Sequence, residues 1–556
     1  LYNWRIDVRP RVVGKFDEKG EWSLVESGGR VDHGKWLLPA AGELTPAMIA
    51  RALASRIARF HTSETITARL EFLEGKEKAL ASKTFAIDRV PTFCPGCPHN
   101  TSTTLPEGSR AVAGIGCHYM VTWMPERGTA TFSHMGGEGV AWVGQSPFTE
   151  TAHIFANLGD GTYFHAGLLA IRQSVAAKVN ITYKLLYNDA VAMTGGQNVD
   201  GTLTVPILAA QLAAEGIHNM VVVTDGTERA DGPADLPHGT PIRHRDDIDA
   251  IQREFRELPG TSAIIFDQTC AAEKRRRRKR GTYPDPQRRM FINESVCEGC
   301  GDCGVQSNCT AIIPVETEFG RKRAIDQNAC NKDYSCTKGF CPSFVSVVGG
   351  KLRKKSEAIG ATLSARVEAL PDPILPNLSS PYGILITGVG GTGVITVGAL
   401  IGMAAHIDGL GVTVLDMAGL AQKGGSVYSH VRIAHHPDEL HAVRIAAGEA
   451  DALIGADLVV SASDEALAKM ASGKTKAIIN SALSPTSEFA RNPDWLFPRD
   501  KMQNSISDAI GAAATDFIDA QKMATSLIGD AMATNLFMLG YAWQKGLVPV
   551  SAAALL

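Results

Sequence analysis

Residues 153–161 read His-Ile-Phe-Ala-Asn-Leu-Gly-Asp-Gly, an apolar run that ends in a glycine–aspartate–glycine turn. The pattern predicts a helix near 165–178, and a second apolar run at 181–187 ends at Asn188. Further strands are predicted at 219–224 and 262–266. Strands that alternate with helices indicate a parallel sheet with crossover connections, so we expect an α/β fold.

The ends of these two strands suggest a cation site. Asp160 follows the first strand and Asn188 follows the second. A carboxylate and an amide at neighbouring strand ends can share one hard cation, and Mg²⁺ keeps phosphate oxygens in its remaining positions. A lone Gly-Asp-Gly is usually a plain turn, but the order strand, turn, helix, strand, Asn resembles the diphosphate-binding half of a thiamine diphosphate enzyme.

The composition excludes several classes of protein. The 556-residue chain is 44% hydrophobic and 20% charged, which is typical of a folded globular protein rather than a disordered chain. Its net charge of −3 favours neither nucleic acid nor an anionic membrane. Residues 383–406 lack charged side chains but contain seven glycines, so we interpret them as strand, glycine turn and helix rather than a membrane span.

Cysteine spacing predicts iron–sulfur or other metal sites. Eleven cysteines fall into two groups, and nothing in the sequence indicates the export that disulfides require. The first group could be a zinc knuckle or a redox pair at its C-x-x-C, but four thiolates would also satisfy one [4Fe–4S] cluster. We favour the cluster, with Cys94, Cys97, Cys117 and Cys270 as ligands.

The second group resembles a two-cluster ferredoxin, in which the fourth cysteine of each run serves the other cluster. Its first run is stretched by two residues, and Asp333 stands where the second run would have a cysteine. That carboxylate could bind iron or leave the corner empty as [3Fe–4S]; a zinc ribbon is the alternative. We assign Cys297, Cys300, Cys303 and Cys341 to one cluster and Cys309, Cys330 and Cys336, with Asp333 optional, to the other.

Three further patterns mark the rest of the chain. Gly388-x-Gly390-Gly391-x-Gly393, followed by Asp416, fits a dinucleotide fingerprint for NAD or FAD, but it is weak alone. Residues 274–280 are all Lys or Arg and indicate either a solvated linker or a surface for an acidic partner. Thr45-Pro46 predicts a helix start, and apolar residues at 49, 53 and 57 predict a buried stripe.

Taken together, the chain resembles the fused indolepyruvate ferredoxin oxidoreductase family of 2-oxoacid:ferredoxin oxidoreductases. The resemblance implies the end of an alpha-type region at 1–80, a thiamine diphosphate-binding domain with a proximal cluster at 85–273, a ferredoxin-like domain at 285–345 and a Rossmann-like gamma-type domain at 381–556. It is carried by Cys94–Asn100, His134–Gly139, Asn157–Gly161, Tyr187–Gln197, Cys297–Cys309, Cys330–Pro342, Gly388–Gly393 and Gln422–Val427.

The resemblance also implies a reaction. An aryl 2-oxoacid such as indolepyruvate is oxidatively decarboxylated, coenzyme A takes the acyl group, and ferredoxin takes the electrons through [4Fe–4S] clusters, one proximal and one or two ferredoxin-like. Mg²⁺ is held by Asp160, Asn188 and the main-chain carbonyl of Ala190. The other implied cofactor contacts are Gly159, Gly161, Thr194, Gly195, Gly196 and Gln197.

One departure from the family concerns the second half of a thiamine site. No further α/β domain is recognisable before residue 80, and the sequence begins Leu1-Tyr2-Asn3, so we expect a fragment or processed piece that is inactive alone. The pyrimidine-binding half would come from an upstream region or another chain. We expect a cytoplasmic homo-oligomer; the alternative is a non-catalytic iron–sulfur electron-transfer module with an NAD(P)- or FAD-binding domain at 285–556.

Overall fold

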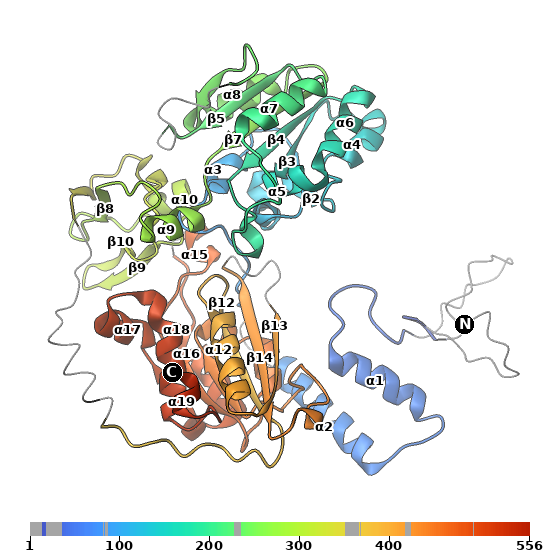
Figure 1. Cartoon of the computed structure of the whole chain (residues 1–556), viewed down its shortest axis with the longest axis vertical. Coiled ribbons are helices and arrows are strands. Elements are labelled where there is room, and N and C mark those ends of the chain that lie inside the picture. The colour runs from blue at the N-terminus through green and yellow to red at the C-terminus, as the bar shows by residue number, and fades with distance from the viewer. Residues whose placement is uncertain are drawn as a thin grey trace, which may run out of the picture.

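The structure is a computed structural model that describes residues 14–17, 36–81, 83, 87–226, 235–350, 366, 369–417, 424–492 and 494–556. Figure 1 shows a parallel-sheet unit (residues 87–279), a cysteine-rich segment (residues 285–348) and a C-terminal unit (residues 382–556). Gln422-Lys423, at the start of one segment that carries the resemblance, lies outside the described residues.

Two helices precede the parallel-sheet unit. Helix α1 (Pro46–Ile57) begins where the Thr45 hydroxyl accepts a hydrogen bond from the Met48 N–H, as the cap signal predicts. The predicted burial of its stripe is wrong, because Ile49, Leu53 and Ile57 are 41%, 57% and 46% exposed. Helix α2 (Glu64–Ala81) instead packs on the C-terminal unit, with Leu80 against that unit's core.

The parallel-sheet unit holds a seven-stranded sheet of order β2-β1-β3-β4-β7-β5-β6, and each adjacent pair is parallel. This confirms the predicted α/β fold. Helices α6 and α7 cover one face and α8 the other, and apolar side chains fill both interfaces. The bounds are β1 Ala111–Ala113, β2 Thr129–Phe132, β3 Ile154–Gly159, β4 Ile181–Tyr187, β5 Met220–Thr224, β6 Ile242–His244, β7 Thr261–Asp267, α4 Val140–Gln145, α6 Leu168–Ala177, α7 Val205–Ala214 and α8 Ile248–Phe255.

The basic run is not a solvated linker. It forms helix α9 (Ala271–Lys279), and its side chains bind other parts of the chain. The Arg278 guanidinium donates to the Asn331 carbonyl at 2.8 Å, and Lys279 pairs with Asp530 at 3.0 Å. The run is therefore a structural connector, which corrects the linker interpretation.

The cysteine-rich segment is built from two small antiparallel pairs, β8 with β11 and β9 with β10. Its core is small and includes Cys297 and Cys303 beside four aliphatic or methionine side chains. The bounds are β8 Arg288–Ile292, α10 Asp302–Ser307, β9 Ile312–Thr317, β10 Gly320–Ile325 and β11 Phe344–Val348.

The C-terminal unit has a six-stranded sheet of order β13-β14-β12-β15-β16-β17. The charge-free stretch 383–406 forms strand, turn and helix as predicted, and in the described part of the chain no helix is long and apolar enough to cross a membrane. The bounds are β12 Tyr382–Val389, α12 Val394–Ile407, β13 Gly411–Met417, β14 Ser426–Ala434, β15 Ala452–Gly455, α13 Leu458–Ser461, α14 Asp464–Lys469, β16 Lys476–Asn480, α16 Arg499–Ile510, β17 Thr515–Ile518, α17 Ala520–Ile528 and α18 Thr534–Gln544.

Strand order in this unit argues against a dinucleotide site. In a dinucleotide-binding fold the strand that ends in the ribose-binding acid lies next to the strand before the glycine turn. Here the antiparallel strand β14 lies between β12 and β13, so Asp416 is one strand removed from the Gly388–Gly393 turn. The NAD or FAD interpretation of Asp416 is therefore not supported.

Candidate functional site

Asp160 lies where β3 ends, at the same sheet edge at which β4 ends in Asn188. Its carboxylate accepts hydrogen bonds from the N–H groups of Gly161 (2.8 Å), Asn188 (2.9 Å) and Asp189 (2.9 Å). Burial raises the pKa of Asp160 to about 6, while these backbone hydrogen bonds oppose the rise. The structure thus brings Asp160 and Asn188 together.

The side chain of Asn188 supplies the second oxygen. Its Oδ1 atom is buried and has no hydrogen-bond partner in the structure. A buried acceptor of this kind calls for a donor or a cation, because leaving it unsatisfied costs about 1–3 kcal/mol. An amide oxygen and the Asp160 carboxylate are oxygen donors of the kind that Mg²⁺ prefers, so these residues fit a Mg²⁺–diphosphate group.

The segment after Asn188 closes into a small hairpin. The N–H of Val191 donates to the Gln197 carbonyl at 2.7 Å, and the hydroxyl of Thr194 donates to the Gln197 amide oxygen at 2.9 Å. Gly195 and Gly196 have φ values of +131° and +87°, which favour glycine. Thr194 and Gln197 are exposed, and their side chains are bonded to each other within the hairpin.

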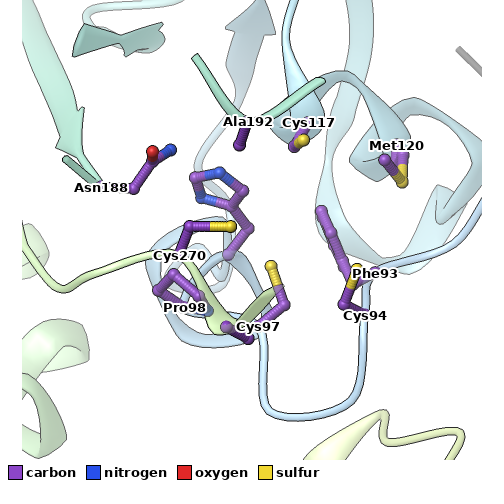
Figure 2. A pocket seen from close by; sticks show the side chains of 11 residues that line it. Phe93, Cys94, Cys97, Pro98, Cys117, Met120, Asn188, Ala192 and Cys270 are labelled. Carbon is purple, nitrogen blue, oxygen red and sulfur yellow. The ribbon is translucent and has the colours of Figure 1, made fainter. Parts of the chain in front are cut away.

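The first four cysteines line one pocket. Cys94 and Cys97 lie in one turn, Cys117 begins the short helix η1 (Cys117–Trp123), and Cys270 immediately precedes α9. Figure 2 shows their side chains around the same space. Burial raises the pKa of the Cys97 thiol well above its usual value, and the other three thiols raise it further.

The thiol pocket and the candidate cation site are adjacent. Asn188 lines the pocket, and its main-chain carbonyl accepts a hydrogen bond from the Cys270 N–H at 2.9 Å. A redox group among the four thiols would therefore lie beside a cofactor held at Asp160. In the described part of the chain, no three His, Cys, Asp or Glu side chains are close enough together to hold a single metal ion.

In the cysteine-rich segment, Cys309, Cys330 and Cys336 lie near one another, and so do Cys297, Cys300 and Cys303. Burial raises the pKa of Cys309 and Cys336 to about 12, with Cys330 adding to both. Burial likewise raises the pKa of Cys303 to about 11, with Cys297 and Cys300 nearby. Cys341 contacts the Ser343 hydroxyl at 3.0 Å, and Asp333 pairs with Arg245 of the parallel-sheet unit.

Comparison with known proteins gives the family. Residues 383–556 match the pyruvate ferredoxin/flavodoxin oxidoreductase family and residues 1–83 the indolepyruvate ferredoxin oxidoreductase middle domain. Indolepyruvate oxidoreductase subunit IorB of Methanothermobacter thermautotrophicus is 30% identical over 175 residues, which cover 32% of this chain and 84% of IorB. The chain belongs to the indolepyruvate ferredoxin oxidoreductase family.

A second subunit of the same family also matches this chain. Subunit IorA of Thermococcus kodakarensis is 28% identical over 331 residues, covering 56% of this chain and 47% of IorA. This chain thus spans about half the length of the IorA proteins it matches. Among solved structures, pyruvate oxidoreductase subunit PORC from Thermotoga maritima is 17% identical, with a TM-score of 0.23 over 32% of this chain and 82% of PORC.

Several buried groups of this family member were not singled out from sequence. Glu138 is fully buried; its Oε2 accepts from the Gly136 N–H at 2.8 Å, and its Oε1 has no partner in the structure. Burial lowers the pKa of His99 to about 4 and that of His118 to about 3, so both imidazoles are neutral at pH 7. The sequence offered one clue to the two histidines: His99 lies two residues after Cys97, and His118 directly follows Cys117.

Proposed function

We propose that this member of the family carries out the electron-accepting half of a thiamine-dependent oxidative decarboxylation of an aryl 2-oxoacid. In that reaction the bond between the carbonyl carbon and the carboxylate breaks and CO₂ leaves. The acyl group forms a thioester with coenzyme A, whose thiol proton is released, and two electrons pass singly to ferredoxin. The observation that carries the proposal is that Asn188 both lines the thiol pocket and donates its N–H to Asp160.

The residues assigned to the cofactor follow from the oxygen donors at the strand ends. Asp160, Asn188 and the carbonyl of Ala190 would hold Mg²⁺ against the diphosphate. Thiamine diphosphate, when bound, supplies a ring that stabilises the carbanion left after CO₂ departs. The neutral rings of His99 and His118, 6.1 Å apart, add no positive charge beside that site at pH 7.

The thiols would carry the electrons away. We assign Cys94, Cys97, Cys117 and Cys270 to a proximal cluster, because all four line one pocket. The thiols of the cysteine-rich segment would take the electrons onward, and Cys300, which lies near Cys303, is exposed. If Cys300 is a cluster ligand, the exit toward ferredoxin would lie at the surface of that segment.

The proposal includes partners outside the described residues. The pyrimidine-binding half of the thiamine site would come from another part of the assembly, which we expect to be a homo-oligomer. All eleven cysteines are free thiols, which fits a reducing cytoplasm as the compartment.

The test measures cofactor content first and enzymatic turnover second. Protein purified anaerobically and reconstituted with Mg²⁺, thiamine diphosphate, iron and sulfide should retain thiamine and iron. With its pyrimidine-binding partner it should reduce ferredoxin only when indolepyruvate and coenzyme A are both present. Iron without any thiamine retention would instead support the electron-transfer module, and zinc in place of iron would refute both.

A further inference from the structure

Asp333 occupies the position at which a ferredoxin would have a cysteine, but its carboxylate is turned toward another unit. Its Oδ1 lies 2.5 Å from Nη1 of Arg245, which precedes α8 in the parallel-sheet unit. Nη2 of the same guanidinium donates to the Asp333 carbonyl at 3.0 Å. Both side chains are largely buried, at 9% and 13% exposed, so this is a charge-assisted contact shielded from solvent.

Both carboxylate oxygens of Asp333 have donors. Gln268 Nε2 donates to Oδ1 at 3.4 Å, and the Ser335 hydroxyl donates to Oδ2. Gln268 also donates to Asp225 at 3.1 Å, which extends the network into the parallel-sheet unit. A carboxylate that is paired with a guanidinium and hydrogen-bonded at both oxygens is a poor ligand for an iron ion. If Asp333 bound iron instead, Arg245 would be left buried without its partner.

The backbone at Asp333 is fixed by the turn that carries Cys94 and Cys97. A Cβ added at Gly96 would lie 2.9 Å from the Asp333 Cβ, so the two chain segments touch. Asn331 Nδ2 donates to the Pro95 carbonyl at 2.8 Å. The Gly96 N–H hydrogen-bonds to the Cys309 thiol and lowers its pKa against the larger effect of burial. These contacts hold Asp333 at the junction between the two units.

We propose that Asp333 docks the cysteine-rich segment onto the parallel-sheet unit and is not an iron ligand. The site formed by Cys309, Cys330 and Cys336 then has three thiolates and takes a [3Fe–4S] cluster, because a fourth iron would have no protein ligand there. This inference rests on the proposed function, in which these thiols hold iron–sulfur clusters.

The test reads the cluster type directly. The protein is reconstituted anaerobically with excess ferrous iron and sulfide, freed of unbound metal and examined by electron paramagnetic resonance after mild oxidation. We expect about one paramagnetic [3Fe–4S] centre and about 11 iron atoms per chain, since oxidised [4Fe–4S] clusters give no such signal.

Three variants separate docking from ligation. Asp333→Asn should leave the signal and the iron content unchanged, because no ligand is lost. Asp333→Cys should add a thiolate, abolish the signal and raise iron to about 12 per chain. Glu316→Gln, which changes an exposed acid of the same segment, is the matched control and should match the parent.

The inference is overturned if the reconstituted parent lacks the [3Fe–4S] signal, and a signal that then arises in Asp333→Asn would identify Asp333 as the lost ligand. The parent spectrum decides this even if a variant fails to fold. A protein that takes up no iron at any site would refute the proposed function itself, and the two failures are therefore distinguishable.

Discussion

Lys184 allows a test of the fold that needs no cofactor. It lies on β4 with 1% of its surface exposed, and its ammonium donates to the carbonyl of Ser102 at 2.7 Å and to the side-chain oxygen of Gln252 at 3.0 Å. Burial lowers the pKa of Lys184 from 10.5 to about 7, and nearby Arg127 lowers it further. Replacing Lys184 with Met should therefore change how stability depends on pH.

The direction in which stability changes with pH follows from the number of protons that the folded and unfolded chains bind. Between about pH 7 and the usual lysine value, the unfolded chain carries one more proton at this position than the folded chain. Stability therefore rises with pH in that window, by about 1.4 kcal/mol per pH unit and about 5 kcal/mol in all. Below pH 7 the folded protein bears the full cost of the buried charge. Lys184→Met removes this contribution to the slope.

Hydrogen exchange gives the local free energy of opening. Exchange of peptides covering β4, corrected for the intrinsic rate, is measured from pH 7 to 10 in the parent and in Lys184→Met. As pH rises, the parent's free energy of opening should increase relative to that of the variant by about 1.4 kcal/mol per pH unit. Lys178→Met, at an exposed lysine, is the control and should follow the parent. Parallel lines for the parent and Lys184→Met would refute the assignment of a depressed pKa.

Three further predictions concern the site and its support. Asp160→Ala should lose most bound thiamine because a hard anionic ligand is gone, whereas exposed Asp200→Ala should retain it; equal retention would refute the cation site. Cys270→Ser should lower iron by up to about four atoms per chain, and unchanged iron content would exclude Cys270 as a ligand. Arg89→Ala should destabilise the C-terminal unit by about 3–5 kcal/mol, because it leaves Asp457 buried without its 2.7 Å partner; unchanged hydrogen exchange in β15 would contradict this.

The parallel sheet and the meeting of its strand ends were predictable because their causes are local. Apolar runs and glycine turns set each strand's ends, and parallel pairing brings the ends of neighbouring strands to one edge. Asp160 and Asn188 therefore had to meet once β3 and β4 paired. Cys270 could be grouped with the other three cysteines for a similar reason, since β7 ends at the same edge, three residues before it.

Features that depend on distant partners were not predictable. The stripe of α1 showed which face is apolar but could not show whether a partner covers it, and Leu53 is 57% exposed. Asp416 fitted the spacing of a dinucleotide fingerprint, which assumes that β12 and β13 are adjacent. In the fold, β14, which follows both in sequence, lies between them. Asp333 likewise fitted a ligand position, and only the fold reveals Arg245, 88 residues away, as its partner.

Helix α9 shows most clearly why the role of a run of Lys and Arg residues cannot be inferred from composition alone. Cys270 at its start lines the thiol pocket, Arg277 in its middle pairs with Asp189 at 2.6 Å, and Arg278 binds the carbonyl of Asn331. One helix thus joins the thiol pocket, the loop at the candidate cation site and the cysteine-rich segment. Because Arg277 also donates to the Asp189 carbonyl at 3.1 Å, it fixes the backbone next to Asn188 with two hydrogen bonds that a lysine could not reproduce in the same geometry. The arginines of α9 are therefore best explained by the distances they maintain between these sites, rather than by an electrostatic field presented to solvent.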